Sequence, residues 1–265
     1  MKISIIGAGN MGGAITRGLS KCNQFKASDI FVSDINKETL QKIKDFNADI
    51  HCSTSNIESI QGADIVILAV KPWLIEAIAS EILDTLDYDS QIILSIAAGV
   101  PLAKLKELFP VKDGEVPTLF RMIPNTAMDV LESFSCISSY NANSEQEELI
   151  VKIFNESGKA MLVPESQLNA FMSLSSCGIA YAFRYIRAAT EGAVELGLYP
   201  NVAKEVVMQT LKGAIALLEA NGTNPEVEID KVTTPGGVTI KGLNEMESAG
   251  FTSSVIRGLK ASYIE

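Results

Sequence analysis

The chain has 265 residues, of which 47% are hydrophobic and 20% are charged. It is therefore long enough for one large domain or two ordinary ones, and it can bury a sizeable core. Its formal net charge of −10 argues against a nucleic acid or an anionic membrane as the main partner. Any anion that it binds must be held locally, by backbone N–H groups or by a single cation.

The cysteines and the histidine predict no metal site. Four cysteines are scattered along the chain, and only one histidine is present, so the usual ligand spacings of zinc sites are missing. We expect reduced thiols. No stretch of membrane-spanning length lacks a charge or a breaker, so the composition predicts a soluble, cytoplasmic protein.

Short β-branched runs alternate with segments of helical spacing over residues 1–163. The expected strands are Lys2–Ile6, Ile30–Ser33, Ile65–Val70, Ile92–Ser95, Leu119–Met122, Ser135–Ser138 and Ala160–Val163. The expected helices are Met11–Lys21, Lys37–Asp45, Trp73–Leu83, Pro101–Leu108 and Ser144–Asn155. This alternation is typical of a parallel sheet covered on both faces. It predicts a doubly wound α/β domain over residues 1–163.

The strand signals stop after Pro164, and the remaining pattern is helical. The expected helices are Gln167–Ser175, Ala180–Leu196, Val202–Glu219, Val238–Ala249 and Ser253–Tyr263. The second of them is rich in small residues, which let helices approach closely, and five helices in about 100 residues enclose little interior of their own. We therefore expect an all-α dimerisation domain over residues 164–265, with a self-contained bundle as the alternative.

A GxGxxG motif follows the first strand and opens the first helix. It consists of Gly7, Ala8, Gly9, Asn10, Met11 and Gly12. In this motif the first glycine permits a tight turn, the second lets a pyrophosphate approach the backbone, and the third lets the helix pack on the strand. The phosphates lie at the helix N-terminus. The context predicts a Rossmann-type site for NADPH or NADH.

Residues at other strand ends should line the same cofactor, because ligands bind beyond the carboxyl ends of parallel strands. Asp34 ends the second strand, where an acid would bind the ribose 2′-hydroxyl of NAD, whereas Asn36 and Lys37 could meet a 2′-phosphate. An aspartate at this position is also a routine helix cap. Two loops follow the next strands, namely Ala69, Val70, Lys71 and Pro72, and then Ile96, Ala97 and Ala98. Lys71 could equally be a solvated loop residue.

The motifs GAGNMG (7–12), AVKP (69–72), AAG (97–99), RMIPNT (121–126) and TTPGGVTIKGL (233–243) occur together. This combination resembles pyrroline-5-carboxylate reductase, and the resemblance covers the whole chain. It implies a Rossmann domain followed by a helical domain that forms an interlocked homodimer, often assembled into larger rings. It also implies reduction of the cyclic imine 1-pyrroline-5-carboxylate to L-proline by NAD(P)H, the last step of proline biosynthesis.

The resemblance further implies roles for single residues. Besides the glycine loop and the loops at 69–72 and 96–98, NAD(P)H would contact Asn56 and Lys231. The substrate would contact Glu165, Val238 and Thr239, with Thr234 nearby. Glu165 could hydrogen-bond the ring nitrogen, or it could be an acid at a helix start that the helix dipole stabilises.

The Pro-Gly-Gly turn suits the carboxylate of such a substrate. Backbone N–H groups of Gly236, Gly237, Val238 and Thr239 can form an anion-binding concavity without any Arg or Lys. The hydride would pass from the nicotinamide to the C=N carbon. Thr239 would orient or protonate the ring nitrogen; alternatively, it caps the helix that begins there.

One segment departs from the family pattern. The family has SGSGPAY before its long helix, whereas this chain has SSCGIAY at 175–181, which affects the pocket wall or the dimer packing. Two other functions fit parts of the sequence. A two-domain reductase of a 3-hydroxy acid or another imine would use a lysine of the helical half. A dinucleotide-sensing protein without turnover would need no TTPGGVT turn.

Overall fold

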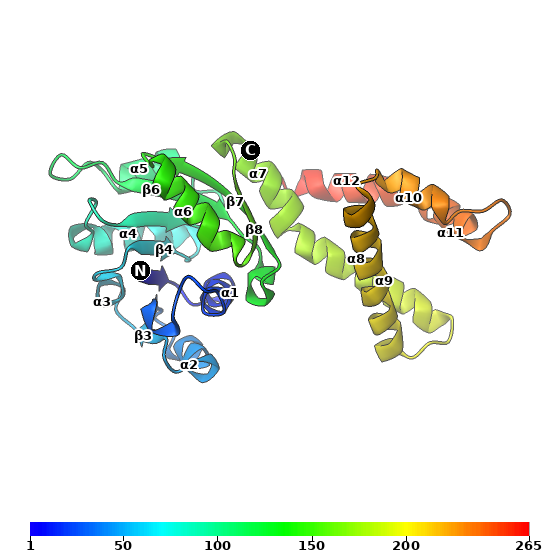
Figure 1. The fold of residues 1–265 in the computed structure, drawn as a ribbon, viewed down its shortest axis with the longest axis horizontal. Helices are drawn as coiled ribbons and strands as arrows, with labels where there is room; N and C mark the ends of the chain where they lie inside the picture. The colour runs from blue at the N-terminus through cyan, green and yellow to red at the C-terminus, as the bar shows by residue number, and fades with distance from the viewer. Residues whose placement is uncertain (265) are drawn as a thin grey trace. The chain divides into compact units, whose positions relative to one another are not determined.

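The computed structural model describes residues 1–264, which form two compact units (Figure 1). The first unit contains residues 1–176 together with 263–264, and the second contains residues 177–262. The first unit is an α/β domain and the second consists of helices. The predicted fold class, a doubly wound Rossmann domain followed by an all-α domain, is confirmed.

One eight-stranded sheet, in the order β3-β2-β1-β4-β5-β6-β7-β8, organises the first unit. Its strands are β1 (Ile3–Ile6), β2 (Ile30–Ser33), β3 (His51–Ser53), β4 (Ile65–Leu68), β5 (Ile92–Ser95), β6 (Thr118–Ile123), β7 (Ser133–Tyr140) and β8 (Gly158–Leu162). The longer helices between them are α1 (Asn10–Leu19), α2 (Lys37–Phe46), α3 (Asn56–Ile60), α4 (Ile75–Ile82), α5 (Leu102–Leu108) and α6 (Ser144–Asn155). The strand order reverses at β1, between β2 and β4, which places a ligand crevice at the carboxyl ends of these strands.

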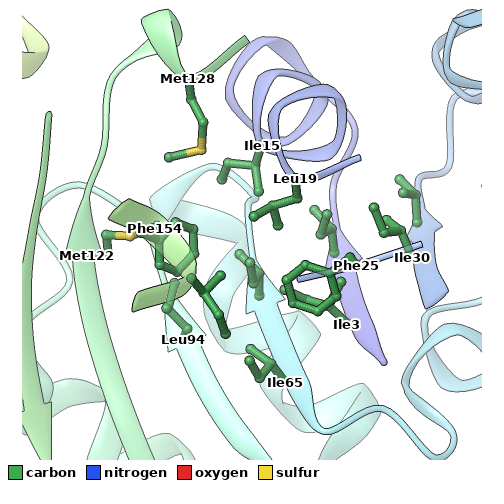
Figure 2. Close-up of a cluster of buried hydrophobic side chains, with 14 of the residues drawn as sticks. Ile3, Ile15, Leu19, Phe25, Ile30, Ile65, Leu94, Met122, Met128 and Phe154 are labelled. Carbon is green, nitrogen blue, oxygen red and sulfur yellow. The ribbon is translucent and has the colours of Figure 1, made fainter. Parts of the chain in front are cut away.

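Hydrophobic side chains fill both faces of the sheet. On one face the strands pack against α1, α2 and α6, and Figure 2 shows Ile15, Leu19 and Phe154 gathered over strand residues such as Ile3 and Ile65. On the other face they pack against α3, α4 and α5. Every residue of β1, β4 and β5 is buried, as expected for central parallel strands, which are covered on both faces.

The direction of β7 corrects the expectation of an all-parallel sheet. β7 pairs antiparallel with β6, and β8 pairs parallel with β7. The connection over residues 124–132 contains only the short 3₁₀ helix η4 (Thr126–Val130). A parallel pair needs a crossover of a dozen or more residues, so this connection forces the chain to reverse.

Three short elements were not predicted from the sequence. β3 carries no aliphatic residue and forms an exposed edge of the sheet. The helix α3 spans little more than one turn. In the second unit, α10 (Pro225–Lys231) was missed because the Asn224-Pro225 pair is typical of a break between helices. In the structure the Asn224 side chain caps this helix by accepting from the N–H of Glu226.

The segment after β8 packs on the sheet through a small third core. Leu168 and Met172 contact Ile123 and Cys136 there, and burial raises the pKa of the Cys136 thiol to about 12. The segment comprises the 3₁₀ helix η5 (Glu165–Gln167), α7 (Leu168–Phe171) and the π-helical η6 (Met172–Ser176). By contacts, therefore, residues 164–176 belong with the sheet, although the sequence pattern sets the domain boundary at 163/164.

The helices of the second unit leave most of their apolar side chains exposed. They are α8 (Gly178–Glu195), α9 (Pro200–Asn221), α10, α11 (Val238–Ser248) and α12 (Phe251–Ala261). α8 and α9 pack against each other. Within residues 177–262, Ala203 is the only fully buried residue, whereas Phe183 is 64% and Ile215 57% exposed. A self-contained bundle would bury these side chains, so this unit does not complete its own core.

None of the helices within residues 1–264 combines the length and the apolar composition needed to cross a membrane.

Candidate functional site

Two close contacts shape the glycine loop after β1. Gly7 has a φ of +99°, and its N–H donates to the carbonyl oxygen of Ser33 at 2.7 Å. A Cβ on Gly7 would lie 2.6 Å from the carbonyl oxygen of Ala69, and a Cβ on Gly12 would lie 1.9 Å from that of Gly7. Real Cβ atoms do not approach so closely, so both positions require glycine.

The loop is open at Gly9. This residue is the N-cap of α1. No side chain caps the helix, and the first turn of the helix carries no acidic residue. A Cβ on Gly9 would meet nothing within 4 Å. The N–H groups of Asn10 and Met11 have no partners within the helix, as at any helix start, so they are available to an anion. This combination of a tight turn and an open helix N-terminus fits a pyrophosphate.

The loop after β4 lies beside the glycine loop. Besides the Ala69 carbonyl, the side chain of Val70 comes within 3.0 Å of the Cβ position on Gly7. Lys71 is exposed, and its carbonyl accepts from Leu74 at 2.9 Å where the 3₁₀ helix η2 (Pro72–Leu74) begins. These contacts place residues 69–72 against the entrance of α1.

The loop after β5 ends at the same edge of the sheet. The N–H of Ile96 donates to the carbonyl of Leu68 at 3.1 Å, which holds this loop beside the end of β4. Ala97 is buried and Ala98 is exposed. The structure thus brings the three predicted cofactor loops together at the carboxyl ends of β1, β4 and β5.

Asp34 bonds to the glycine loop. Its Oδ2 accepts from the N–H of Ala8 at 2.7 Å, and its Oδ1 accepts from the N–H of Asn36 at 2.8 Å. The side chain of Asn36 caps α2 by accepting from the N–H groups of Glu38 and Thr39. Asp34 therefore lies at the predicted cofactor site, while the Asn36 side chain is engaged in its own helix.

Asn56 is buried beneath the same edge. Its Oδ1 accepts from the Ser33 hydroxyl at 2.7 Å, and its Nδ2 donates to Glu81 at 2.9 Å. These bonds tie α3 to β2 and α4. A contact between Asn56 and the cofactor stays a prediction.

Glu165 forms an ion pair with Arg121. The Oε1 atom of Glu165 lies 3.1 Å from Nη1 of Arg121, and it also accepts from the backbone N–H of Leu102 at 2.6 Å. The second guanidinium nitrogen, Nη2, donates to Oδ1 of Asn169 at 3.1 Å. Arg121 is 4% exposed and Glu165 31%, so the carboxylate reaches the surface, where it lines an open depression with Ser138 and residues 162–164.

Sequence reasoning used Arg121 only as part of a family motif and missed its position in this cluster. The sequence did carry a signal for this cluster, namely a single cation among the mainly apolar residues of the strand TLFRMI. A buried arginine requires partners, so such a cation indicates an ion pair or hydrogen bonds. Its Nε has no hydrogen-bond partner among residues 1–264.

The Pro-Gly-Gly segment forms a type II turn. The N–H of Gly237 donates to the carbonyl of Thr234 at 2.9 Å, and Gly236 has a φ of +75°. Proline at the second position and a glycine of positive φ at the third define this turn type. Gly236 therefore requires glycine for its positive φ. A Cβ on Gly237 would lie 2.6 Å from the Thr234 hydroxyl, which can rotate, and 3.0 Å from the Thr234 carbonyl oxygen.

The turn leads directly into α11 without a side-chain cap. Gly237 is the N-cap, and no side chain bonds to the first turn. Val238 is 84% exposed, and Thr239 is exposed too. Because Gly237 holds the cap position, the Thr239 hydroxyl does not cap the helix. The free N–H groups of the first turn are those of Val238, Thr239 and Ile240. The N–H of Gly237, which the sequence analysis expected to bind the anion, is used within the turn.

Lys231 pairs with an acid of its own helix. Its Nζ donates to Oε1 of Glu228 at 2.7 Å. This bond, with further ones from Thr223 and Asn221, lowers the pKa of the Glu228 carboxyl to about 2. The predicted contact of Lys231 with a cofactor stays a prediction.

The predicted site residues form two groups. The cofactor residues at 7–12, 34, 69–72 and 96–98 meet in the first unit, which also holds Glu165, whereas residues 234–239 and Lys231 lie in the second. A Rossmann sheet with a glycine loop shaped for a pyrophosphate, followed by a helical unit, is typical of NAD(P)-dependent oxidoreductases. Residues 2–99 match the family model described as NADP oxidoreductase, coenzyme F420-dependent, and residues 165–265 match that of pyrroline-5-carboxylate reductase dimerisation.

Full-length relatives narrow the class. Pyrroline-5-carboxylate reductase 1 of Dictyostelium discoideum is 36% identical over 98% of this chain, which spans 48% of that relative's length. The pyrroline-5-carboxylate reductase of Methanosarcina acetivorans is 35% identical, with 98% of this chain and 96% of the relative covered. The Plasmodium falciparum pyrroline carboxylate reductase, solved with NADP bound, matches with a TM-score of 0.89 at 26% identity, over 99% of this chain and 95% of the other. The chain belongs to the pyrroline-5-carboxylate reductase family.

Family membership confirms the resemblance seen in the sequence and the expectation of an NAD(P)H-dependent oxidoreductase. The matching dimerisation domain supports homo-oligomerisation. Similarity to a Mycobacterium tuberculosis 3-hydroxyisobutyrate dehydrogenase, with a TM-score of 0.54 at 12% identity, reflects the fold alone. Family membership therefore favours neither a reductase of a 3-hydroxy acid or another imine nor a dinucleotide sensor without turnover.

Proposed function

We propose that this chain reduces 1-pyrroline-5-carboxylate to L-proline with NAD(P)H. Family membership supports the reaction, and the observation that carries the substrate assignment is the uncapped turn at 234–239. A helix N-terminus that no side chain caps presents N–H groups and the positive end of the helix dipole to an anion. The substrate is a small cyclic imine with one carboxylate, so it offers a matching anion.

The carboxylate is bound by the N–H groups of Val238 and Thr239. The type II turn fixes their direction, because Gly236 and the Gly237–Thr234 hydrogen bond determine where α11 begins. The Thr239 hydroxyl then lies beside the bound ring, where it orients or protonates the nitrogen. Because the first turn of α11 has no acidic residue, no negative side chain there opposes the carboxylate.

The residues around α1 hold the cofactor. The N–H groups of Asn10 and Met11 bind the pyrophosphate, while residues 69–72 and 96–98 line the rest of the site. When bound, the reduced nicotinamide supplies the hydride. Glu165 contacts the substrate with Oε2, because Oε1 is already held by Arg121 and Leu102.

The functional molecule is a homodimer built through the C-terminal helices, and such dimers assemble into a larger ring. The exposed apolar side chains of the second unit support the dimer, as does the dimerisation domain matched by residues 165–265.

The test combines turnover with removal of one N–H group. The purified protein is mixed with pyrroline-5-carboxylate and NADH or NADPH, and proline is identified by mass spectrometry. Val238→Pro removes the first N–H of α11, at a helix position that tolerates proline. Gly237 already has φ −65° and ψ 167°, which is the conformation that a residue before proline prefers. Val238→Ala changes the side chain but keeps the N–H, so it is the matched control.

We expect turnover by the wild-type protein and by Val238→Ala. Val238→Pro should raise KM for the imine by about tenfold or more, because a hydrogen bond to a charged group contributes roughly 1.5–3 kcal/mol. Absence of proline formation with either cofactor would overturn the proposed reaction. A Val238→Pro enzyme with an unchanged KM would overturn the assignment of the carboxylate to this turn.

A further inference from the structure

In this fold the carboxyl end of β2 meets the adenosine ribose of a dinucleotide, and the end of β3 lies beside it. We call this edge the ribose rim and define it as Asp34, Asn36, Ser53 and Glu58. Its strands are linked, because the N–H of Asp34 donates to the carbonyl of Ser53 at 3.3 Å. The groups on this rim determine whether a ribose with a free 2′-hydroxyl or one with a 2′-phosphate is accepted.

The charge of Asp34 is held in place beside the glycine loop. Both of its oxygens accept from backbone N–H groups, one of them in the glycine loop itself, at Ala8. Hydrogen bonds of this kind to a carboxylate are short and strong. Each oxygen keeps a further lone pair, so the carboxylate can still accept from a ribose hydroxyl. It cannot turn away from a phosphate without breaking both bonds.

The start of α2, the nearest alternative anion site, is already occupied. The Asn36 side chain accepts from the N–H groups of Glu38 at 2.9 Å and Thr39 at 3.4 Å. Lys37 is the only cation within residues 33–41, and Glu38 follows it directly. No arginine occurs in that stretch, although arginine is the residue best suited to a phosphate.

The other side of the rim is also acidic. Glu58 hydrogen-bonds the hydroxyl of Ser53, which places a second carboxylate on the β3 side. A 2′-phosphate at this rim would therefore face Asp34 and Glu58. The nearby cations are Lys37 and Lys44, and Lys44, which lines a pocket with Ser53 and Glu58, donates its Nζ to the carbonyl of Ala48. Like charges placed opposite each other exclude a ligand more effectively than a missing contact does.

We infer that this chain selects NADH over NADPH and that Asp34 is the residue that sets the choice. The inference rests on the proposed function, which identifies the cofactor site, and it adds which of the two cofactors binds there.

Binding of two cofactor fragments tests the inference without any turnover. ADP-ribose and 2′-phospho-ADP-ribose differ only in the 2′-phosphate, and their dissociation constants are measured by isothermal titration calorimetry on the wild-type protein. We expect ADP-ribose to bind at least about tenfold more tightly. Equal binding of the two fragments, or tighter binding of the phosphorylated one, would overturn the inference with no mutation involved.

Two variants then locate the effect. Asp34→Ser removes the charge and keeps a hydroxyl that can accept from the loop, and it should bring the two dissociation constants to within about threefold of each other. Asp45→Ser removes one charge from the other end of α2, where Asp45 accepts from Gln41, and should leave the ratio unchanged. Equal loss of selectivity in both variants, or unchanged selectivity in Asp34→Ser, would show that Asp34 does not set the choice.

Failure of this inference and failure of the proposed function are distinguishable. Selective binding of ADP-ribose by a protein that leaves pyrroline-5-carboxylate unchanged would overturn the reaction and support the cofactor choice. Proline formation at equal efficiency with both cofactors, together with equal fragment binding, would support the reaction and overturn the choice.

Discussion

Thr239 is the second residue of α11, and its hydroxyl points to no partner among residues 1–264. The alternative role of a helix cap is removed by Gly237, which occupies the cap position. An exposed hydroxyl that makes no structural hydrogen bond and lies beside the free N–H groups of a helix start is suited to orienting a substrate. The proposed role of Thr239 can therefore be tested without a large loss of stability.

Thr239→Ala should lower kcat by about 100-fold, a typical loss when a positioned proton-transfer group is removed. Thr239→Ser, which retains the hydroxyl, should recover most of that loss. The dissociation constant of NADH, measured by fluorescence titration, should stay the same in both variants because the cofactor residues lie around α1. An alanine variant that turns over at the wild-type rate would remove Thr239 from the mechanism.

At the scale of elements, the Arg121–Glu165 pair links three of them. Arg121 belongs to β6, Leu102 begins α5, and Glu165 begins η5. A guanidinium that is 4% exposed has lost most of its hydration, so its stability depends on the carboxylate beside it. The pair consequently fixes the segment after β8 to the sheet.

Glu165→Ala should lower the free energy of unfolding by about 3 kcal/mol, because it leaves the Arg121 charge buried without its counter-charge. The control is Glu76→Ala. Its carboxylate is 74% exposed and 4.0 Å from Lys104, so the loss should stay under about 0.5 kcal/mol. Urea denaturation followed by circular dichroism measures both.

The double variant Arg121→Met/Glu165→Ala tests whether the unpaired charge of Arg121 causes the loss of stability in Glu165→Ala. It should be more stable than Glu165→Ala alone, because replacing both charges of a buried pair avoids the unpaired ion. If Glu165→Ala and Glu76→Ala lowered the free energy of unfolding by the same amount, the buried charge of Arg121 would not depend on Glu165.

Elements with a strong apolar period were predicted from the sequence, and weak or context-dependent ones were not. β1, β2 and β5 were found because their residues are continuous apolar or β-branched runs, while β3, with the sequence HCS, owes its existence to pairing with β2. The reversal at β7 depends on the length of a connection, which strand patterns do not report. The same limit explains why residues 167–175 were predicted as one helix, although they divide among η5, α7 and η6.

The candidate site was predicted unevenly for a similar reason. Local motifs such as the glycine loop and the Pro-Gly-Gly turn carry their geometry in the sequence, because positive φ and close backbone approach require glycine. Pairings over long separations are not local. The Arg121–Glu165 pair and the Asp34–Ala8 bond join residues that only the folded sheet brings together.

At the scale of the whole molecule, the second unit depends on a partner. Its helices bury almost nothing within one chain, and the apolar side chains of α9 include Ile215 and Leu217, both more than half exposed. Burying such side chains contributes about 1.5–3 kcal/mol each. An interface of many of them would stabilise both the dimer and the fold of the unit.

Ile215→Glu should shift the molecule from dimer or larger assemblies towards monomer, measured by analytical ultracentrifugation, because an unpaired carboxylate would be buried at the interface. The control, Gln61→Glu, adds the same charge at an exposed position of the first unit and should leave the assembly intact. A dimer of wild-type affinity in Ile215→Glu would show that this face of α9 lies outside the interface.

The chain leaves the first unit after Ser176 and returns to it at Tyr263, where the carbonyl of Ile264 accepts from Nδ2 of Asn169 at 2.8 Å. Topologically, the helical unit is therefore one long insertion between two points of the sheet domain. The entropy cost of closing such a loop grows only with the logarithm of its length, by about 0.6 kcal/mol per doubling. Evolution could accordingly lengthen, shorten or reshape the inserted helices to change the assembly, with little effect on the stability of the nucleotide-binding sheet.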